Sequence, residues 1–371
     1  MCRILHLADV HLDAPLGGFG REAEARRREV LDAFRALADL APREGIDAVL
    51  IAGDLFDGPR PSEATVIAVR ETVRRLVEQS IPVFAVPGNH DARALNPGLY
   101  ADALTDATIF DAPTFGPPAV VERAGDRLHV YGVAFDAAEE PDPLSTFART
   151  GAVGVHVVLL HGSIPGAPHW GAGSSLSIPV ERLAGLGVDY IALGDLHRFR
   201  GPEALGGARA CYPGSFAGVD LTESGLRGPV VVELPGEGGP RIRRLSSGVH
   251  EVGSEVAIDV SGCDSDLGVA EEVTRLVAAD SYPVVVLRGE PGYPLDTEVV
   301  RSMLEERFGV VALRDESRFF DVHRLEQIGR HNTIAGHIAR LGLEAIRDAA
   351  EDERPALEQG LRIALRVMEV P

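Results

Sequence analysis

Five short polar clusters, each directly after an apolar segment, carry the residue types that could do chemistry in this chain. Aspartate, asparagine and histidine together suit divalent metal ions of intermediate hardness. Glycines in the clusters let the backbone approach an ion closely, because they have no side chain. The clusters are Asp9-Val10-His11, Gly53-Asp54-Leu55-Phe56-Asp57, Gly88-Asn89-His90-Asp91, His161-Gly162 and Gly194-Asp195-Leu196-His197.

The segments before these clusters have the composition of buried strands. They are Ile4–Ala8, Ala48–Ala52, Val83–Val86, Val155–Leu160 and Tyr190–Leu193. A single cluster would be weak evidence, because Gly and Asn are ordinary turn residues. Five clusters in this order, each at a strand end, predict that the polar side chains meet at one edge of a sheet, where open α/β folds place their sites.

Alternating strand and helix patterns fill the first two hundred residues or so. Apolar residues at helical spacing predict a helix over Arg21–Leu40, and Ser62 is expected to open a second helix. Further strands are expected at Leu128–Phe135, Val155–Leu160, Val188–Leu193 and Gly228–Leu234. This order predicts an α/β protein with two packed sheets flanked by helices.

A Gly- and Pro-rich segment at 235–240 predicts a break between domains. We expect a catalytic domain at 1–235, a small α/β domain at 241–320 and a helical tail at 321–371, which Pro355 divides into two helices. The small domain is expected to contain strands at Ala257–Val260 and Val284–Leu287 and helices at Asp266–Ala278 and Asp296–Phe308.

Composition indicates a globular protein with two domains or more, because 371 residues exceed the size at which one core keeps growing. Three widely separated cysteines, Cys2, Cys211 and Cys263, argue against a disulfide framework. The N-terminus leads straight into a strand, and no apolar segment is long enough to span a bilayer. We therefore expect a cytoplasmic protein.

The net charge of −20 is unusual for a protein that binds nucleic acid. Positions 1–235 hold 20 Arg against 31 acidic residues, and positions 236–371 hold 16 Arg against 25, with no lysine anywhere. Bound divalent ions would offset part of this charge. Any affinity for DNA must therefore be local, weak or supplied by a partner.

With these motifs in place, the chain resembles the calcineurin-like metallophosphoesterase superfamily, whose pattern runs D-x-H, G-D, G-N-H-[D/E], H and G-H-x-H. More narrowly, it is similar to the SbcD-type DNA repair exonuclease branch. The narrower match is carried by Leu5–Ala14, Ile51–Thr65 and Tyr212–Glu233. The resemblance implies a four-layer α/β/β/α sandwich with a small α/β capping domain.

The resemblance also implies a two-metal site, with Mn²⁺ as the favoured ion and Mg²⁺ as the alternative. One ion would be held by Asp9, His11 and His197, and the other by Asn89, His161 and Asp195, while Asp54 would bridge both. His90 resembles the catalytic histidine of the family. It would stabilise the phosphoryl oxygens and help to protonate the leaving oxygen.

Two positions depart from the branch pattern. Asp57 stands where SbcD-type enzymes often have histidine, and in the phosphatases of the superfamily an aspartate at this spacing pairs with the catalytic histidine. Asp195 replaces the first histidine of G-H-x-H. A carboxylate there would make the site harder and more anionic, which favours Mn²⁺ or Mg²⁺ over zinc. The alternative is that this position no longer binds metal.

Three functions remain open from the sequence. The favoured one is a two-metal phosphodiesterase that hydrolyses DNA, with an SbcC-type SMC-like ATPase subunit as partner and a homodimer left open. The others are a phosphomonoesterase or small-substrate phosphodiesterase, and a catalytically weak subunit of a DNA-processing complex. The apolar stripe of the tail, formed by Leu325, Ile328, Ile334, Ile338 and Leu341, must be buried against either the protein itself or the ATPase.

Overall fold

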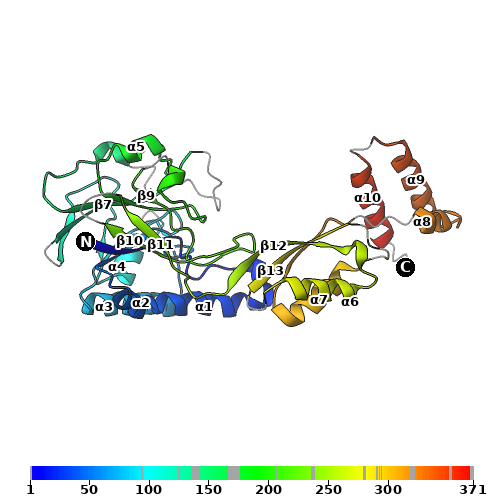
Figure 1. Cartoon of the computed structure of the whole chain (residues 1–371), viewed down its shortest axis with the longest axis horizontal. Helices are drawn as coiled ribbons and strands as arrows, with labels where there is room; N and C mark the ends of the chain where they lie inside the picture. Colours follow the sequence, from blue (N-terminus) through cyan, green and yellow to red (C-terminus); the bar gives the residue numbers. More distant parts are fainter. Residues whose placement is uncertain are drawn as a thin grey trace. The chain divides into compact units, whose positions relative to one another are not determined.

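Two β-sheets form the centre of the first of two compact units in the computed structural model (Figure 1). This unit comprises Met1–Ser254 with Asp280–Tyr282, and the second comprises Glu255–Ala279 with Pro283–Pro371. The structure describes residues 2–92, 95–123, 126–134, 142–165, 176–205, 208–234, 239–278, 281–289, 291, 293, 295–317, 322–350 and 353–367.

The first sheet has six strands in the order β11-β10-β1-β2-β3-β4. Strands β1 to β4 are parallel, β10 is antiparallel to β1, and β11 is antiparallel to β10. The ends of the parallel strands that carry the polar clusters therefore lie at one edge. The strands are β1 (Cys2–Leu7), β2 (Ala48–Ala52), β3 (Val83–Val86), β4 (Thr108–Ile109), β10 (Val230–Leu234) and β11 (Arg241–Arg244).

The second sheet has five strands in the order β5-β6-β7-β8-β9. Strands β6 to β9 are parallel, and β5 is the antiparallel partner of β6. The predicted strand at Leu128–Phe135 is confirmed up to Val133, and Phe135 lies outside the described residues. The strands are β5 (Ala119–Arg123), β6 (Asp126–Val133), β7 (Val155–His161), β8 (Tyr190–Gly194) and β9 (Ala210–Cys211).

Successive side chains along each strand point to opposite faces of the sheet, and this divides the first unit into layers. Figure 1 shows helices below and above the sheets. Side chains on one face of β1, such as Leu5, pack against helices α1 (Ala23–Arg35), α2 (Leu37–Arg43) and α3 (Glu63–Glu78). Ile4, on the opposite face, packs against the second sheet. The outer face of the second sheet packs under α5 (Val180–Ala184), and this confirms the predicted α/β class.

The helix predicted over Arg21–Leu40 is divided in the structure, because α1 ends at Arg35 and α2 starts at Leu37. The predicted start of the next helix is confirmed, since the Ser62 hydroxyl accepts a hydrogen bond from the Thr65 amide at 3.2 Å. The shorter helices of this unit are η1 (Gly17–Glu22), α4 (Leu99–Ala103), η2 (Pro143–Thr146) and η3 (Pro202–Leu205).

The second unit contains a three-stranded sheet in the order β12-β13-β14. Its core joins strand residues such as Val285 to helix residues such as Val269 and Leu304. The predicted strands and helices are all present, and the domain boundaries stay predictions, although β11 extends the first sheet beyond 235. The elements are β12 (Glu251–Asp259), β13 (Ser281–Arg288), β14 (Ala312–Asp315), η4 (Val260–Gly262), α6 (Asp266–Leu276) and α7 (Thr297–Phe308).

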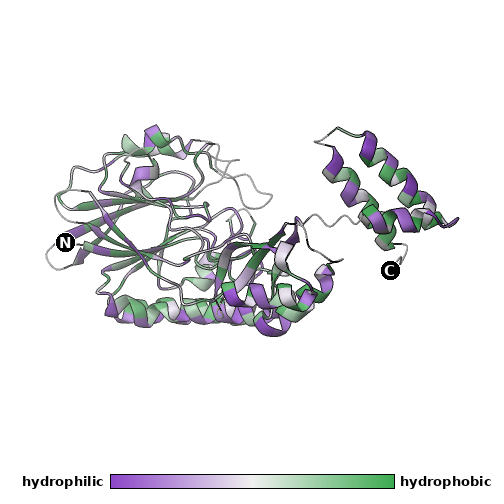
Figure 2. Ribbon diagram, turned by 45° about the vertical axis from the view of Figure 1, so that its right-hand side comes forward, coloured by the Kyte–Doolittle hydropathy of each residue, from purple (hydrophilic) through white to green (hydrophobic). Residues whose placement is uncertain are grey.

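The described part of the tail contains three helices, α8 (Val322–Gly329), α9 (Ile334–Asp348) and α10 (Arg354–Val367), rather than the two that were predicted. Pro355 lies in the first turn of α10 and not between two helices. Proline is tolerated there, because amides in the first turn have no hydrogen-bond partner within the helix. Ile346 packs against Leu361 and Leu365 between α9 and α10. Hydrophobic and hydrophilic residues alternate along these helices in Figure 2.

In the part of the chain that the structure describes, no helix combines the length and the apolar character that crossing a membrane requires.

Helix α3 offers a matched test of this packing, because Val69 is fully buried and Val77 is 36 % exposed. Val69→Ala should lower the free energy of unfolding by about 2 kcal/mol, since two methyl groups leave the core and a cavity remains. Val77→Ala should change it by less than about 1 kcal/mol. Urea denaturation of both variants measures the difference, and equal losses would contradict the described burial of α3.

Candidate metal centre

The loops after five parallel strands bring the predicted side chains together. Asp9 and His11 follow β1, Asp54 follows β2, and Asn89 with His90 follows β3. On the second sheet, His161 ends β7, while Asp195 and His197 follow β8. Among the described residues, three mutually close groups result: Asp9, His11 and His197; Asp9, Asp54 and His161; and His11, Asp57 and His90.

The backbone at these loops is strained. Asp9, His11, Asp54 and Asp195 all have positive φ angles, of 50°, 50°, 48° and 103°. A residue other than glycine is uncommon in this region, and the strain persists only where surrounding contacts hold it. Here the Val10 and His11 amides both donate to the Asp54 carbonyl, at 2.9 and 3.1 Å, so that the first two loops fix each other.

Three motif glycines make room for the candidate ligands themselves. A Cβ atom on Gly88 would lie 2.1 Å from Asp54 Oδ1, and one on Gly53 would lie 2.3 Å from His161 Nδ1. A Cβ atom on Gly194 would lie 1.9 Å from the Ala52 carbonyl oxygen. Any side chain at these positions would displace the loops, and glycine is therefore required for this close approach.

His11 and His197 face each other with their Nε2 atoms 3.1 Å apart. His11 Nδ1 lies 3.0 Å from Asp57 Oδ1, and His197 Nδ1 lies 2.5 Å from Glu223 Oε1. Because each carboxylate accepts the Nδ1 proton, both Nε2 atoms carry lone pairs in the neutral rings. Two lone pairs that point at each other fit a cation between them, and a carboxylate behind each imidazole is typical of metal-binding histidines.

His161 has the same arrangement on the other side of the centre. Its Nδ1 donates to the Ala52 carbonyl at 2.9 Å, which leaves Nε2 as the lone pair. The oxygens around Nε2 are Asn89 Oδ1 at 3.0 Å, Asp54 Oδ2 at 3.5 Å and Asp195 Oδ1 at 3.6 Å. These atoms make a second set of donors that fits a divalent cation.

Asp54 lies between the two sets. Its Oδ2 atom is 3.8 Å from His11 Nε2 and 3.5 Å from His161 Nε2. Its Oδ1 atom accepts a hydrogen bond from the His90 amide at 3.0 Å, which orients the carboxylate. Asp54 thus has the position that a bridging ligand needs.

Electrostatics favour a cation at this centre. Burial raises the pKa of Asp9 to about 8, and the charge of Asp54 contributes to the increase. Burial alone would lower the pKa of His161, but Asp54, Asp195 and Asp9 raise it well above its ordinary value. Buried negative charge contributes to both pKa shifts, although burial is the larger cause for Asp9, and a divalent cation would neutralise that charge.

His90 lies beside the two donor sets, with its ring 4.8 Å from that of His11. Its Nδ1 donates to the main-chain carbonyl of Asp57 at 3.0 Å, whereas the Asp57 carboxylate is 3.9 Å away and binds His11 instead. The predicted pairing of Asp57 with His90 is therefore made mainly through the backbone. His90 is 23 % exposed, so it remains accessible to a substrate.

Two further carboxylates support the site and were given no role from the sequence. Glu223 is buried, and its Oε2 atom accepts a hydrogen bond from the Ser215 hydroxyl at 2.8 Å. Burial would raise the pKa of Glu223, but its bond to His197 and the charge of Arg227 lower it overall. The only sequence signal was the position of Glu223 inside the Tyr212–Glu233 match.

Asp91 is the second supporting carboxylate. Its oxygens accept hydrogen bonds from the Gly88 amide at 2.8 Å, the Phe56 amide at 3.0 Å and the Tyr100 hydroxyl at 2.9 Å. Burial and the charge of Asp54 raise its pKa to about 6. Asp91 therefore holds the loop after β2 against the loop after β3.

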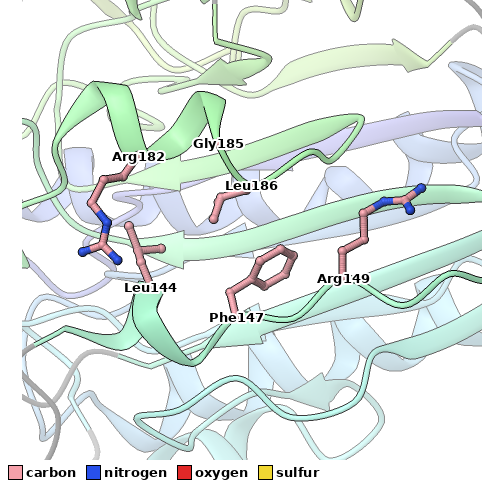
Figure 3. A pocket seen from close by; sticks show the side chains of 6 residues that line it. All are labelled: Leu144, Phe147, Arg149, Arg182, Gly185 and Leu186. Carbon is pink, nitrogen blue, oxygen red and sulfur yellow. The ribbon is translucent and has the colours of Figure 1, made fainter.

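A hollow of about 490 Å³ lies elsewhere on the first unit (Figure 3). It is lined by Leu144, Phe147, Arg149, Arg182, Gly185 and Leu186, which precede β7 and β8 in the chain. His161 and Asp195 come at the other ends of these strands, so the hollow and the candidate centre are separate features.

Comparisons with known proteins identify one family model and several similar proteins. A model of the calcineurin-like phosphoesterase family matches residues 2–199. An uncharacterized metallophosphoesterase, YhaO of Bacillus subtilis, is 25 % identical over 97 % of this chain and 98 % of its own length. A DNA double-strand break repair protein Mre11 from Aeropyrum pernix is 32 % identical over 64 % of this chain and 59 % of its own. The solved structure of TT1561 from Thermus thermophilus covers 66 % of this chain and 98 % of its own, with a TM-score of 0.38 and 17 % identity.

The family match extends over more than half of the chain and ends just beyond His197. Because it runs through every loop that supplies a donor atom to the centre, this chain belongs to the calcineurin-like phosphoesterase family and is a metal-dependent phosphoesterase.

Proposed function

We propose that this protein is a two-metal phosphodiesterase that hydrolyses DNA. The observation that carries the proposal is the pair of donor sets that share Asp54, with three imidazole Nε2 lone pairs directed inward. Paired divalent ions neutralise a phosphodiester and activate a water molecule for attack. The DNA substrate is supported by the similarity to proteins named Mre11.

In this proposal Asp9, His11 and His197 hold one ion. Asn89, His161 and Asp195 hold the other, and Asp54 bridges them. Asp195 Oδ1 lies 3.6 Å from His161 Nε2, and Asp54 Oδ2 lies 3.5 Å from the same atom. This similarity supports the place of Asp195 among the ligands. Oxygen donors outnumber imidazoles in the second set, and Mn²⁺ or Mg²⁺ suits such a set better than zinc.

His90 is the proposed catalytic residue outside the ligand set. Because its Nδ1 proton is held by the Asp57 carbonyl, its Nε2 atom is the one left for the phosphate oxygens and the leaving oxygen. The Asp57 carboxylate has a different proposed role, which is to orient His11. Asp57 is thus a positioning residue for the metal as well as a backbone partner of His90.

The tail helices are the proposed docking site for an SMC-like ATPase partner. Part of the predicted apolar stripe is used internally, because Leu325 and Ile338 pack against the small core around Ile346. Ile334 and Leu341, seven residues apart on one face of α9, stay 74 % and 56 % exposed. An exposed apolar face of this kind fits the helix-in-groove mode of protein recognition.

Metal titration tests the ligand assignment. Metal-free wild-type protein should bind two Mn²⁺ ions in isothermal titration calorimetry. Asp195→Asn should weaken one of them about tenfold or more, since even a group behind a ligand contributes that much. Asp32→Asn, a change to an exposed carboxylate on α1, is the control and should bind as wild type. Wild-type binding by Asp195→Asn would place this residue outside the coordination shell.

Substitution of His90 separates catalysis from metal binding. His90→Gln should lower kcat for DNA and for bis(p-nitrophenyl) phosphate about 10²–10⁴-fold, because a general acid is lost, with both Mn²⁺ ions still bound. Asp57→Asn should instead weaken Mn²⁺ binding about 10–100-fold, because His11 loses its orienting carboxylate. If His90→Gln released an ion, His90 would be a ligand. Hydrolysis of the dye without any hydrolysis of DNA would favour a small-substrate enzyme.

The partner proposal is tested with exposed residues, which can change without loss of the fold. Ile334→Ser combined with Leu341→Ser should abolish co-purification with the co-expressed SMC-like ATPase and ATP-stimulated DNA cleavage, because the apolar contact is removed. Dye hydrolysis should persist. Ile67→Ser, on α3 and 43 % exposed, is the control and should keep the complex. A complex that survives the double change would exclude this face of α9 as the contact.

A further inference from the structure

Two arginines flank Phe199 in the chain immediately after the candidate ligand His197, and a third contacts its ring. Arg198 and Arg200 flank Phe199 in the chain, and Arg244 comes from the edge strand β11. The Arg244 guanidinium carbon lies 4.7 Å from the centre of the Phe199 ring, in a cation–π contact that holds it in place. We call Arg198, Phe199, Arg200 and Arg244 the arginine rim.

The arginine rim is fastened to the candidate metal centre. Arg227 donates to the main-chain carbonyl of His197 and, at 3.0 Å, to the Ser215 hydroxyl. Arg244 donates to the carbonyl of Leu226, so it is tied to the same segment as Arg227. The amides of Arg200 and Tyr212 exchange hydrogen bonds of 3.0 Å with each other's carbonyl groups. These bonds fix the position of the rim relative to His197.

The rim arginines have no acidic partner among the described residues. Several exposed arginines elsewhere on the first unit form ion pairs, as Arg35 does with Asp32 and Arg75 with Asp39, whereas Arg43 and Arg70 bond main-chain carbonyls. Among the described residues, no carboxylate lies within 4.0 Å of the guanidinium groups of Arg198, Arg200 or Arg244. In a chain with 56 acidic and 36 basic residues, unpaired arginines at one place are unexpected.

The rim is a region of locally concentrated positive charge. Arg227 bonds the His197 carbonyl, and Arg244 bonds the carbonyl of Leu226, the residue before Arg227, so two positive charges lie close together and repel each other. Glu223 lies 3.8 Å from Arg227, but it also accepts the proton of His197. From His197 to Arg244 the chain has seven arginines and five acidic residues, against the acidic excess of the whole. Mutual repulsion of this kind is relieved by a bound anion.

We propose that the arginine rim binds the phosphate backbone of a DNA strand next to the scissile phosphate. This inference rests on the proposed function, for which it names the residues that hold the substrate. Guanidinium groups bind phosphate through two parallel hydrogen bonds, and exposed arginines without acidic partners are free to do so. The rim would supply the local affinity for DNA that an acidic protein needs.

The test uses Arg198→Ala combined with Arg244→Ala, two exposed changes that leave the hydrophobic core intact. Binding of a fluorescein-labelled single-stranded oligonucleotide is measured by anisotropy, in EDTA to prevent cleavage, at several salt concentrations. We expect Kd to rise about tenfold at low salt. The slope of log Kd against log salt should fall by about 1.4, since each phosphate contact on single strands contributes about 0.7.

Arg35→Ala combined with Arg74→Ala is the matched control, because both arginines are exposed and pair with acidic residues on their own helices. This control should bind the oligonucleotide within about twofold of wild type. Equal affinity and equal salt slope in the two double variants would overturn the inference, as would a wild-type protein that does not bind the oligonucleotide. Wild-type hydrolysis of the dye with Mn²⁺, measured separately, tests the proposed function and not the rim.

Discussion

The candidate metal centre depends on the hydrogen bonds that orient three buried imidazoles and fix their tautomers. Asp57, Glu223 and the Ala52 carbonyl accept the Nδ1 protons of His11, His197 and His161, so all three Nε2 lone pairs point inward. Without a cation, the Nε2 lone pairs of His11 and His197 would repel each other at 3.1 Å, and the buried carboxylates would favour a proton on His161. With a cation they become a ligand set. The orienting groups therefore decide whether the histidines bind metal or merely fill space.

Two rigid sheets make this convergence possible. Positive φ angles at Asp9, His11, Asp54 and Asp195 are unfavourable, and loops on their own would relax. Parallel strands with buried side chains on both faces hold the loop ends in register, and the amide bonds from the first loop to Asp54 lock two loops together. Glycines at 53, 88 and 194 then allow atoms to approach more closely than any Cβ would permit.

Charge has opposite signs at the centre and beside it. Burial, together with the charge of Asp54, raises the pKa of Asp9, and buried carboxylates raise that of His161, as expected of a site for cations. A few residues beyond His197, arginines without carboxylate partners create a site for anions. An acidic protein can thus combine metal binding with contact to a polyanion, because each charge is concentrated where its counterpart binds.

Much of this protein could be predicted from the sequence, because ligand types at strand ends and apolar periodicity are local properties. The α/β class, the Ser62 cap and the loops that carry Asp54 and His161 follow from such patterns. The partners of these residues did not follow, since Glu223 meets His197 across 26 residues and Asp91 meets Phe56 across 35. The Asp57 side chain was expected to pair with His90. Its carboxylate lies 3.9 Å from His90 Nδ1 but hydrogen-bonds to His11 at 3.0 Å, and spacing in the sequence does not rank these two partners. Pro355 was expected to separate two helices and instead lies in the first turn of one, since proline is tolerated where no amide is needed. The sequence determines which chemical groups are available at each strand end. Side-chain orientation, histidine tautomers and hydrogen-bond partners depend on which distant segments the tertiary structure brings into contact.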